Sequence, residues 1–347
     1  MRGLVRVWYA VFAVVGLGWI GYLVFLPVST PADAQTLAQA RSETSRPDGA
    51  GKPTDLSVGI YILDIIKIND AEQTFFTDVG IRVRWRDRRL AHGAGEPRRA
   101  PLETVWHPRI VAFNARQVAR GLPEEVTIEP DGRVTYIQRF SGTFNVRLDL
   151  HRFPKDEQTV SVRFMVQGLG PDQLKLSVDD EWTAQAPRFT IADWHVEKGL
   201  AHISPIEISD AAARLGFTYE FDVTRDVGYY RLKIISTLVL IVLMAWVSFW
   251  MKTGEIGPKL AMGASAMLTL IAYRFYLSGL VPKVSYMTRM DYFVIGATVL
   301  VFASLIGVLI IDFLERRGTD ELAQKIENLC RVAVPVALGI LIVILER

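Results

Sequence analysis

Four long apolar runs follow one another in the last third of the chain, and they constrain its fold more than any other feature. Three of them, 229–251, 291–314 and 329–345, are apolar enough to face lipid. The remaining run, 259–280, has the length of about 20 residues that crosses a hydrocarbon core, but it is rich in Ala, Gly, Ser and Thr. Small residues allow helices to pack closely, and hydroxyl groups are costly against lipid. We therefore expect this helix to be surrounded by protein or by water.

The composition indicates about two domains, one of them in a membrane. The chain has 347 residues, of which 50% are hydrophobic, and its mean hydropathy is +0.23. Its formal net charge of only +2 gives no support for nucleic-acid binding by bulk electrostatics. The single cysteine, Cys330, excludes an intrachain disulfide, so an exported domain would have to be stabilised by packing alone.

The N-terminal segment 1–34 is typical of a signal peptide or of an uncleaved N-terminal anchor. Two arginines precede a long apolar stretch, and the pattern Ala32-Asp33-Ala34, which suits a signal peptidase, follows it. Both interpretations keep the arginines in the cytoplasm and export the chain that follows. The next segment, 35–55, is rich in Ala, Gln, Ser, Pro and Gly, and it is predicted to be a flexible linker.

From residue 56 the sequence changes to short β-type runs separated by turn signals such as Asp131-Gly132. Apolar and polar residues alternate along these runs, for example in 81–85 (IRVRW). This pattern predicts an extracellular all-β, immunoglobulin-like sandwich over 56–224. A transmembrane channel domain is expected over 225–347, with helices at about 229–251, 258–280, 288–314 and 322–346.

The sequence gives little support for an enzyme. It has five histidines, but no HExxH pair, no GxSxG turn and no Walker loop. For each histidine, a surface or turn position is a better interpretation than a catalytic role. We therefore expect no catalytic residue, no metal site and no cofactor.

One segment is far more specific than the rest. Residues 148–159 (LDLHRFPKDEQT) resemble the signature loop of the pentameric ligand-gated ion channels, the Cys-loop receptor superfamily. That family has an F/Y-P-x-D core closed by two cysteines, and Val146 and Val160 stand in their places here, as in the bacterial members. Other matches follow in the order of the family, and the resemblance covers about 56 to 347. These matches are Trp106-His107-Pro108, Asp131-Gly132, Arg225 before the first membrane helix, 246–250 (WVSFW), 272–276 (AYRFY) and 281–286 (VPKVSY).

The resemblance implies a homopentamer with a central pore lined by the second membrane helix, opened by an extracellular agonist bound between subunits. The expected partners are the other subunits, the lipid bilayer, a small-molecule agonist and permeating monovalent ions, with no nucleic acid. The expected location is the bacterial cytoplasmic (inner) membrane, with several spans and the β domain on the periplasmic or extracellular side. The alternative from another class is a non-conducting, membrane-tethered ligand-binding or scaffold protein.

Residues of the second membrane helix form one stripe, because they are spaced by four, three, four and three positions. Around a fivefold axis this stripe would give rings of side chains, and the rings of Leu268 and Phe275 are candidate hydrophobic gates. A plain packing helix with a small-residue interface is the alternative, and without the upstream motifs the two have about equal weight. The expected pore-lining residues are Ala261, Ser265, Leu268, Ala272 and Phe275.

The resemblance also implies a set of residues that couple the two domains at the membrane surface. A partly buried arginine between carboxylates can hold two arrangements that differ by a few kcal/mol. Ordinary surface ion pairs, worth at most about 1 kcal/mol, are the alternative. The expected coupling residues are Asp70, Glu72, Phe153, Pro154, Asp156, Arg225, Pro282, Lys283 and Tyr286.

The agonist site is expected beneath the hairpin 202–217, which has Phe217 at its end as its only aromatic residue. Amine-binding members of the family build an aromatic box, so this hairpin argues against an amine agonist. Arg139 resembles an arginine that faces the site in related channels and favours an anionic or polar ligand, although a surface strand arginine is the alternative. The candidate ligand-binding residues are Phe113, Arg139, Met165, Gln167, Ile208 and Phe217.

Ion selectivity is expected to be set at the start of the second membrane helix, by Glu255, Gly257, Pro258 and Lys259. Cation channels of the family have a glutamate directly before the basic residue, and Gly257-Pro258-Lys259 resembles the glycine and GABA receptor pattern instead. Helix N-termini, each with roughly +0.5 charge, would also favour anions at this mouth. Glu255 lies close enough to oppose them, so the preference for anions is slight.

Overall fold

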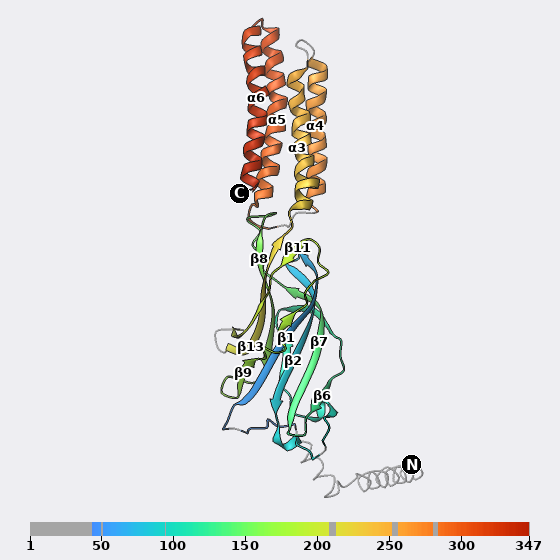
Figure 1. The fold of residues 1–347 in the computed structure, drawn as a ribbon. Coiled ribbons are helices and arrows are strands. Elements are labelled where there is room, and N and C mark those ends of the chain that lie inside the picture. The colour runs from blue at the N-terminus through green and yellow to red at the C-terminus, as the bar shows by residue number, and fades with distance from the viewer. Residues whose placement is uncertain are drawn as a thin grey trace, which may run out of the picture.

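The computed structural model of the chain describes residues 44–49, 51–93, 95–207, 213–251, 256–279 and 284–346. Two sheets form a β-sandwich at one end of the molecule, and a bundle of helices forms the other end (Figure 1). The proposed leader or anchor, and the linker up to residue 43, lie outside the described residues.

The larger sheet has eight strands in the order β10-β1-β2-β7-β6-β3, with β5 also on β7 and β9 also on β1. Buried and exposed or half-buried side chains alternate along β7, as a sheet with one face on the core requires. The strands are β1 (Thr54–Asn69), β2 (Thr74–Arg86), β3 (Arg98–Pro101), β5 (Ala115–Arg120), β6 (Glu125–Ile128), β7 (Arg133–Asn145), β9 (Leu174–Val178) and β10 (Ala184–Gln185).

The smaller sheet has five strands in the order β11-β13-β8-β4, with β12 also on β13. Its aromatic side chains meet those of the larger sheet in the core; for example, the rings of Phe140 and Phe164 have centroids 5.3 Å apart. The strands are β4 (Arg109–Ala112), β8 (Glu157–Gln167), β11 (Trp194–Val196), β12 (Leu200–Glu207) and β13 (Ala213–Arg225). The expected all-β sandwich is confirmed.

The first strand includes the last two residues of the predicted linker. Thr54 pairs with Leu174 of β9, and Arg46 donates to the carbonyl oxygens of Lys52 at 2.6 Å and Gln173 at 3.0 Å. Polar, glycine-rich composition predicted a flexible linker here, but contacts with the edge of the sheet hold Arg46 and Thr54 in place.

The turn at Asp131-Gly132 agrees with its sequence signal. Gly132 has a φ of +82°, and a Cβ there would lie 2.5 Å from the carbonyl oxygen of Asp87. Only glycine allows both this conformation and this close approach of two backbones. Two short 3-10 helices, η1 (Arg88–Leu90) and η2 (Leu102–Thr104), precede β3 and β4 in the chain.

Four helices of the described residues are long and apolar enough to cross a membrane by length and composition. The first begins as a π-helix and ends as a 3-10 helix, and α5 begins with a capping box of Thr288 and Asp291. Each boundary lies within about three residues of the predicted one. The elements are η3 (Tyr230–Ile235), α3 (Ser236–Val247), η4 (Ser248–Trp250), α4 (Ile256–Leu277), α5 (Arg289–Arg316) and α6 (Asp320–Glu346).

Close packing within the subunit explains one of the small residues of α4, Gly263. A Cβ at Gly263 would lie 2.8 Å from Leu305 Cδ1 of α5, so this glycine lets the two helices approach. Figure 1 shows α5 beside α6 and α3 beside α4, with the end of α6 next to the β domain. At that junction, Lys155 Nζ donates to the carbonyl oxygen of Glu346 at 3.1 Å.

Candidate functional site

The junction between the two domains is centred on Arg225, the last residue of β13. Its side chain is 1% exposed, and Asp156, next to β8, accepts from Nε at 2.7 Å and from Nη2 at 3.1 Å. Asp70, directly after β1, accepts from Nη1 at 2.7 Å and from Nη2 at 3.0 Å. One guanidinium therefore joins two carboxylates that come from separate strand ends, each through a bidentate contact.

Aromatic rings enclose the same guanidinium. Its carbon lies 4.1 Å from the ring centroid of Trp194, 4.9 Å from that of Phe153 and 5.8 Å from that of Tyr230. Burial alone opposes the charge of Arg225, but hydrogen bonds to Asp156 and Asp70 outweigh it and raise the pKa of Arg225 above its ordinary value. The group is a permanent buried charge with two anionic partners.

The loop before β8 connects this cluster to the helices. The backbone N–H of Leu150 donates to Tyr286 Oη at 2.9 Å, and the ring of His151 stacks on Tyr286 with centroids 3.9 Å apart. Backbone N–H groups of Arg289 and Met290, at the start of α5, donate to the carbonyl oxygens of His151 and Phe153 at 3.1 and 3.2 Å. A movement of this loop would therefore act directly on the start of α5.

Asp149, in the same loop, is hydrogen-bonded to His151. The side chain and the backbone of His151 both hydrogen-bond to this carboxylate and lower the pKa of Asp149 below its ordinary value. The amide of Gln158 bridges the loop, since its Nε2 donates to Asp156 Oδ2 at 2.7 Å and to the carbonyl oxygen of Asp149 at 2.6 Å.

Most of the predicted coupling residues in the described part of the chain meet at this junction. Asp70, Asp156, Phe153 and Arg225 are in direct contact, Pro154 is buried beside them, and Tyr286 holds the loop. Pro282 and Lys283 lie outside the described residues.

The prediction for Glu72 is not supported, and three further residues escaped the sequence analysis. Glu72 lies on the surface and pairs with Arg116 at 3.3 Å, because the turn after β1 directs only Asp70 toward the cluster. Trp194 escaped because its contact with Arg225 comes from the pairing of two distant segments, β11 and β13. Gln158 lies inside the loop 148–159 and Tyr230 lies five positions after Arg225, so nearness to these motifs was the signal that could have found both.

The predicted stripe of α4 is exposed in the isolated subunit. Leu268 and Phe275 are 71% and 75% exposed, and Ala261, Ser265 and Ala272 are also exposed. The opposite face of the helix, with Ala266 and Leu270, is fully buried within the bundle. This stripe of large and small side chains points away from the subunit's own helix bundle, so a surface or a solvent outside the subunit must lie against it.

The structure places the side chain of Lys259 elsewhere than the sequence predicts. The sequence predicts its charge at the mouth of the stripe, but its side chain is buried and its Nζ lies 3.0 Å from Glu327 Oε1 of α6. A buried lysine needs a counter-charge, and α6 supplies one inside the subunit. Gly257 and Pro258 are exposed in the first turn of α4, and Glu255 lies outside the described residues.

The candidate ligand residues fall on both sheets. In the smaller sheet, Met165 pairs with Val111 and Gly216, and Gln167 lines a pocket of about 720 Å³ with His107 and Arg109. Phe113, which follows β4, is partly exposed. On the larger sheet, Arg139 of β7 forms an ion pair with Asp78 of β2. These two groups do not meet within one subunit.

The prediction for Phe217 is wrong. It is 2% exposed, and its ring stacks on that of Phe164 with centroids 5.3 Å apart. The position at the end of a hairpin favoured a ligand contact, but the alternation of β13 directs this side chain into the core. Ile208 lies outside the described residues.

Two family profiles match the chain, and each matches one end of it. The profile described as the neurotransmitter-gated ion-channel ligand binding domain matches residues 34–226. The profile described as the neurotransmitter-gated ion-channel transmembrane region matches residues 237–341. Together they cover the β-sandwich and the helices.

Similar proteins of known function cover most of the chain. A proton-gated ion channel of Gloeobacter violaceus is 25% identical over 298 residues, which are 84% of this chain and 82% of that protein. The gamma-aminobutyric acid receptor subunit beta-4 of Gallus gallus is 25% identical over 285 residues, which are 78% of this chain and 57% of that subunit.

Proposed function

This chain belongs to the neurotransmitter-gated ion-channel family, and we propose from this premise that five copies surround a pore lined by α4. It is a ligand-gated ion channel and not an enzyme. It is a multi-pass membrane protein with an extracellular β domain, and its fold is that of the family. The proposed location is the bacterial cytoplasmic membrane, and the proposed permeant species are monovalent ions.

The observation that carries the pore assignment is the exposure of Leu268 and Phe275 on a helix that also exposes Ala261, Ser265 and Ala272. Lipid does not account for a stripe of alanine and serine, whereas a water-filled axis accounts for both kinds of residue. In the proposed pentamer, Leu268 and Phe275 form two apolar rings that close the pore by expelling water. The remaining exposed faces of α4 contact neighbouring subunits.

We propose that Arg225, with Asp70 and Asp156, transmits the signal from the β domain to the helices. Support comes from the enclosure of one cation by two carboxylates at the point where β1, β8, β13 and the first helix meet. The ion pairs of Arg225 with Asp70 and Asp156 are buried, so solvent screens them little. A shift of any strand end that carries one of these residues therefore changes a strong electrostatic interaction. Phe153, Pro154 and Tyr286 transfer that change to α5.

We propose that the agonist binds between subunits, because the candidate residues lie on two sheets of one subunit. Phe113, Met165, Gln167 and Ile208 would come from one subunit, and Arg139 from its neighbour. Arg139 favours an anionic or polar small molecule, and its exposed side chain supports this role even though Asp78 already binds it.

Planar-bilayer recording of the purified protein and of its Leu268→Ser variant tests the proposed pore. We expect unitary currents from the variant without any agonist, since a polar ring would wet the constriction. Incorporated protein that passes no current in either form would favour the non-conducting scaffold alternative.

A further inference from the structure

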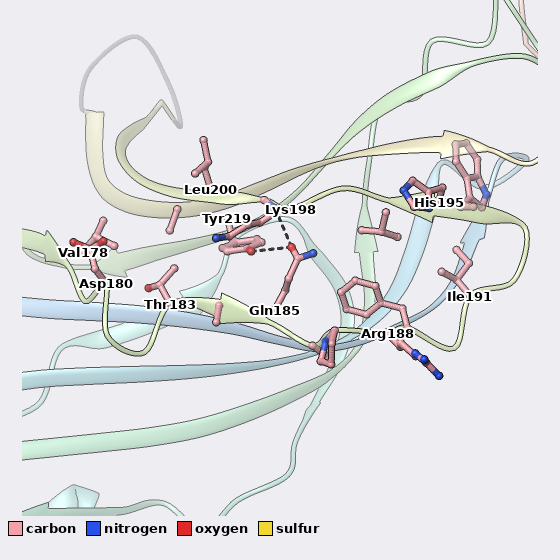
Figure 2. Close-up of a pocket in the computed structure, with 18 residues that line it drawn as sticks. Val178, Asp180, Thr183, Gln185, Arg188, Ile191, His195, Lys198, Leu200 and Tyr219 are labelled. Atoms are coloured by element: carbon pink, nitrogen blue, oxygen red, sulfur yellow. Dashed lines mark hydrogen bonds between the residues drawn. The ribbon is translucent and has the colours of Figure 1, made fainter.

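A pocket of about 810 Å³ opens at the edge of the sandwich, within one subunit. Figure 2 shows the two sides of the pocket. One side is β10 and the chain that follows β10, and the other side is the start of β12 together with β13. Its size falls in the range of about 300–1,000 Å³ that small-molecule sites occupy. It shares no lining residue with the candidate agonist residues described above.

Gln185 holds the two sides of this pocket together. Its Oε1 accepts from Tyr219 Oη at 3.0 Å and from the backbone N–H of Gly199 at 2.9 Å, and its Nε2 donates to the carbonyl oxygen of Glu197 at 3.2 Å. Burial raises the pKa of Tyr219, so its hydroxyl remains a neutral donor. These bonds, drawn in part in Figure 2, fix the walls without a ligand.

The lining combines an apolar wall with an excess of hydrogen-bond donors. Phe189, Ile191 and Trp194 supply apolar surface. Arg188 and Lys198 are exposed at the pocket and form no ion pair with the residues that the structure describes, while Asp180 is the one acidic residue in the lining.

An unpaired donor lies in the same lining. Trp194 is 5% exposed, and its Nε1–H is buried without an acceptor among the described residues. Leaving a buried donor unpaired costs about 1–3 kcal/mol, so such a group is a natural partner for a ligand oxygen.

We propose that this pocket binds a small amphipathic carboxylate, with its apolar body on the aromatic wall and its carboxylate paired with one of the two cations, Arg188 or Lys198, which Figure 2 shows well apart. The bound molecule modulates gating, because Trp194, which lines the pocket, also has its ring centroid 4.1 Å from the buried guanidinium carbon of Arg225. Trp194 and Arg225 are also paired residues of β11 and β13. The modulation rests on the proposed channel function, whereas binding does not.

Binding is tested on the full-length channel in detergent with 3-phenylpropionate and with its neutral amide, 3-phenylpropanamide. Saturation-transfer NMR and a titration followed by thermal unfolding should detect the acid and not the amide. The double variant Arg188→Gln/Lys198→Gln should bind the acid about tenfold more weakly, since it removes both cations with which the carboxylate could form a charge-assisted contact. Lys175→Gln, an exposed lysine of β9 away from the pocket, is the matched control and should bind as the unchanged protein does.

Equal binding of acid and amide, or undiminished binding to the double variant, would overturn the proposal. The second arm records spontaneous currents of the Leu268→Ser channel with and without 3-phenylpropionate. The open probability should change, and the change should be lost in the Arg188→Gln/Lys198→Gln background. Since binding needs no current, a failure of the channel assignment is distinguishable from a failure of this site.

Discussion

The ammonium group of Lys259 lies 3.0 Å from Glu327 Oε1, so the charge at the foot of α4 is neutralised by α6 of the same subunit. Both side chains are nearly inaccessible, at 6% and 4% exposure. Arg331 reinforces the contact, since it lies 3.6 Å from Glu327 and donates through Nε to the carbonyl oxygen of Phe249 at 2.9 Å. Three helices are thereby fixed to one another at the end remote from the β domain.

The first prediction is that Glu327→Gln destabilises the channel. A buried lysine would lose its counter-charge, which costs about 3–5 kcal/mol. Thermal unfolding of the purified protein should show a clear fall in Tm. The double variant Lys259→Met/Glu327→Leu, which removes both charges, should recover most of the loss. A Tm unchanged in Glu327→Gln would mean that the pair contributes nothing.

The second prediction concerns the proposed gate. Leu268→Ser should open the pore without agonist, because it replaces a large apolar ring by a polar one that water can wet. The measurement is the spontaneous open probability in bilayers. Ala272→Ser, on the same stripe, removes no large apolar ring and should remain closed. If Leu268→Ser behaves like Ala272→Ser, the register of the stripe is incorrect.

The third prediction concerns coupling between the domains. In the Leu268→Ser background, Arg225→Ala should lower the spontaneous open probability about tenfold or more, since couplings of about 1–3 kcal/mol are typical of such networks. The variant should still assemble, which size-exclusion chromatography can check. Arg225→Lys keeps the charge but cannot bind both carboxylates in a bidentate manner, so it should give an intermediate value.

An open probability unaffected by Arg225→Ala would assign the cluster to stability alone. Arg316→Ala provides the comparison for a charge that is exposed, because its partner Asp312 lies one turn away on α5. This pair is worth little, about 0.3–0.5 kcal/mol, and its loss should leave the current unchanged.

The fourth prediction is a slight preference for anions. With Lys259 neutralised by Glu327, the argument rests on the five N-termini of α4, each carrying roughly +0.5 charge. In a NaCl gradient, the reversal potential of the Leu268→Ser channel should shift toward the chloride equilibrium potential. A shift toward sodium would contradict this, and Glu255→Gln should then weaken the cation preference. Glu321→Gln, at the start of α6, is the matched control.

Local pattern determined the parts of this protein that depend on neighbours along the chain. The four membrane helices follow from unbroken apolar runs, and the stripe from Ala261 to Phe275 follows from the 3.6-residue period of a helix. The sandwich follows from alternation and turn residues, and the loop 148–159 identified the family before any contact was known. These features need only the sequence because backbone geometry fixes which near neighbours share a face.

Tertiary structure alone decided which distant groups meet. Arg225 binds Asp156 and Asp70, which lie 69 and 155 positions away in the sequence, and Lys259 binds Glu327 at a separation of 68. The family resemblance also gave Phe217 and Glu72 roles, but strand register buried Phe217 and a turn directed Glu72 to solvent. The physical reason is that a buried charge or an unpaired donor takes whichever partner the folded chain brings within about 3 Å, and no local pattern encodes that choice.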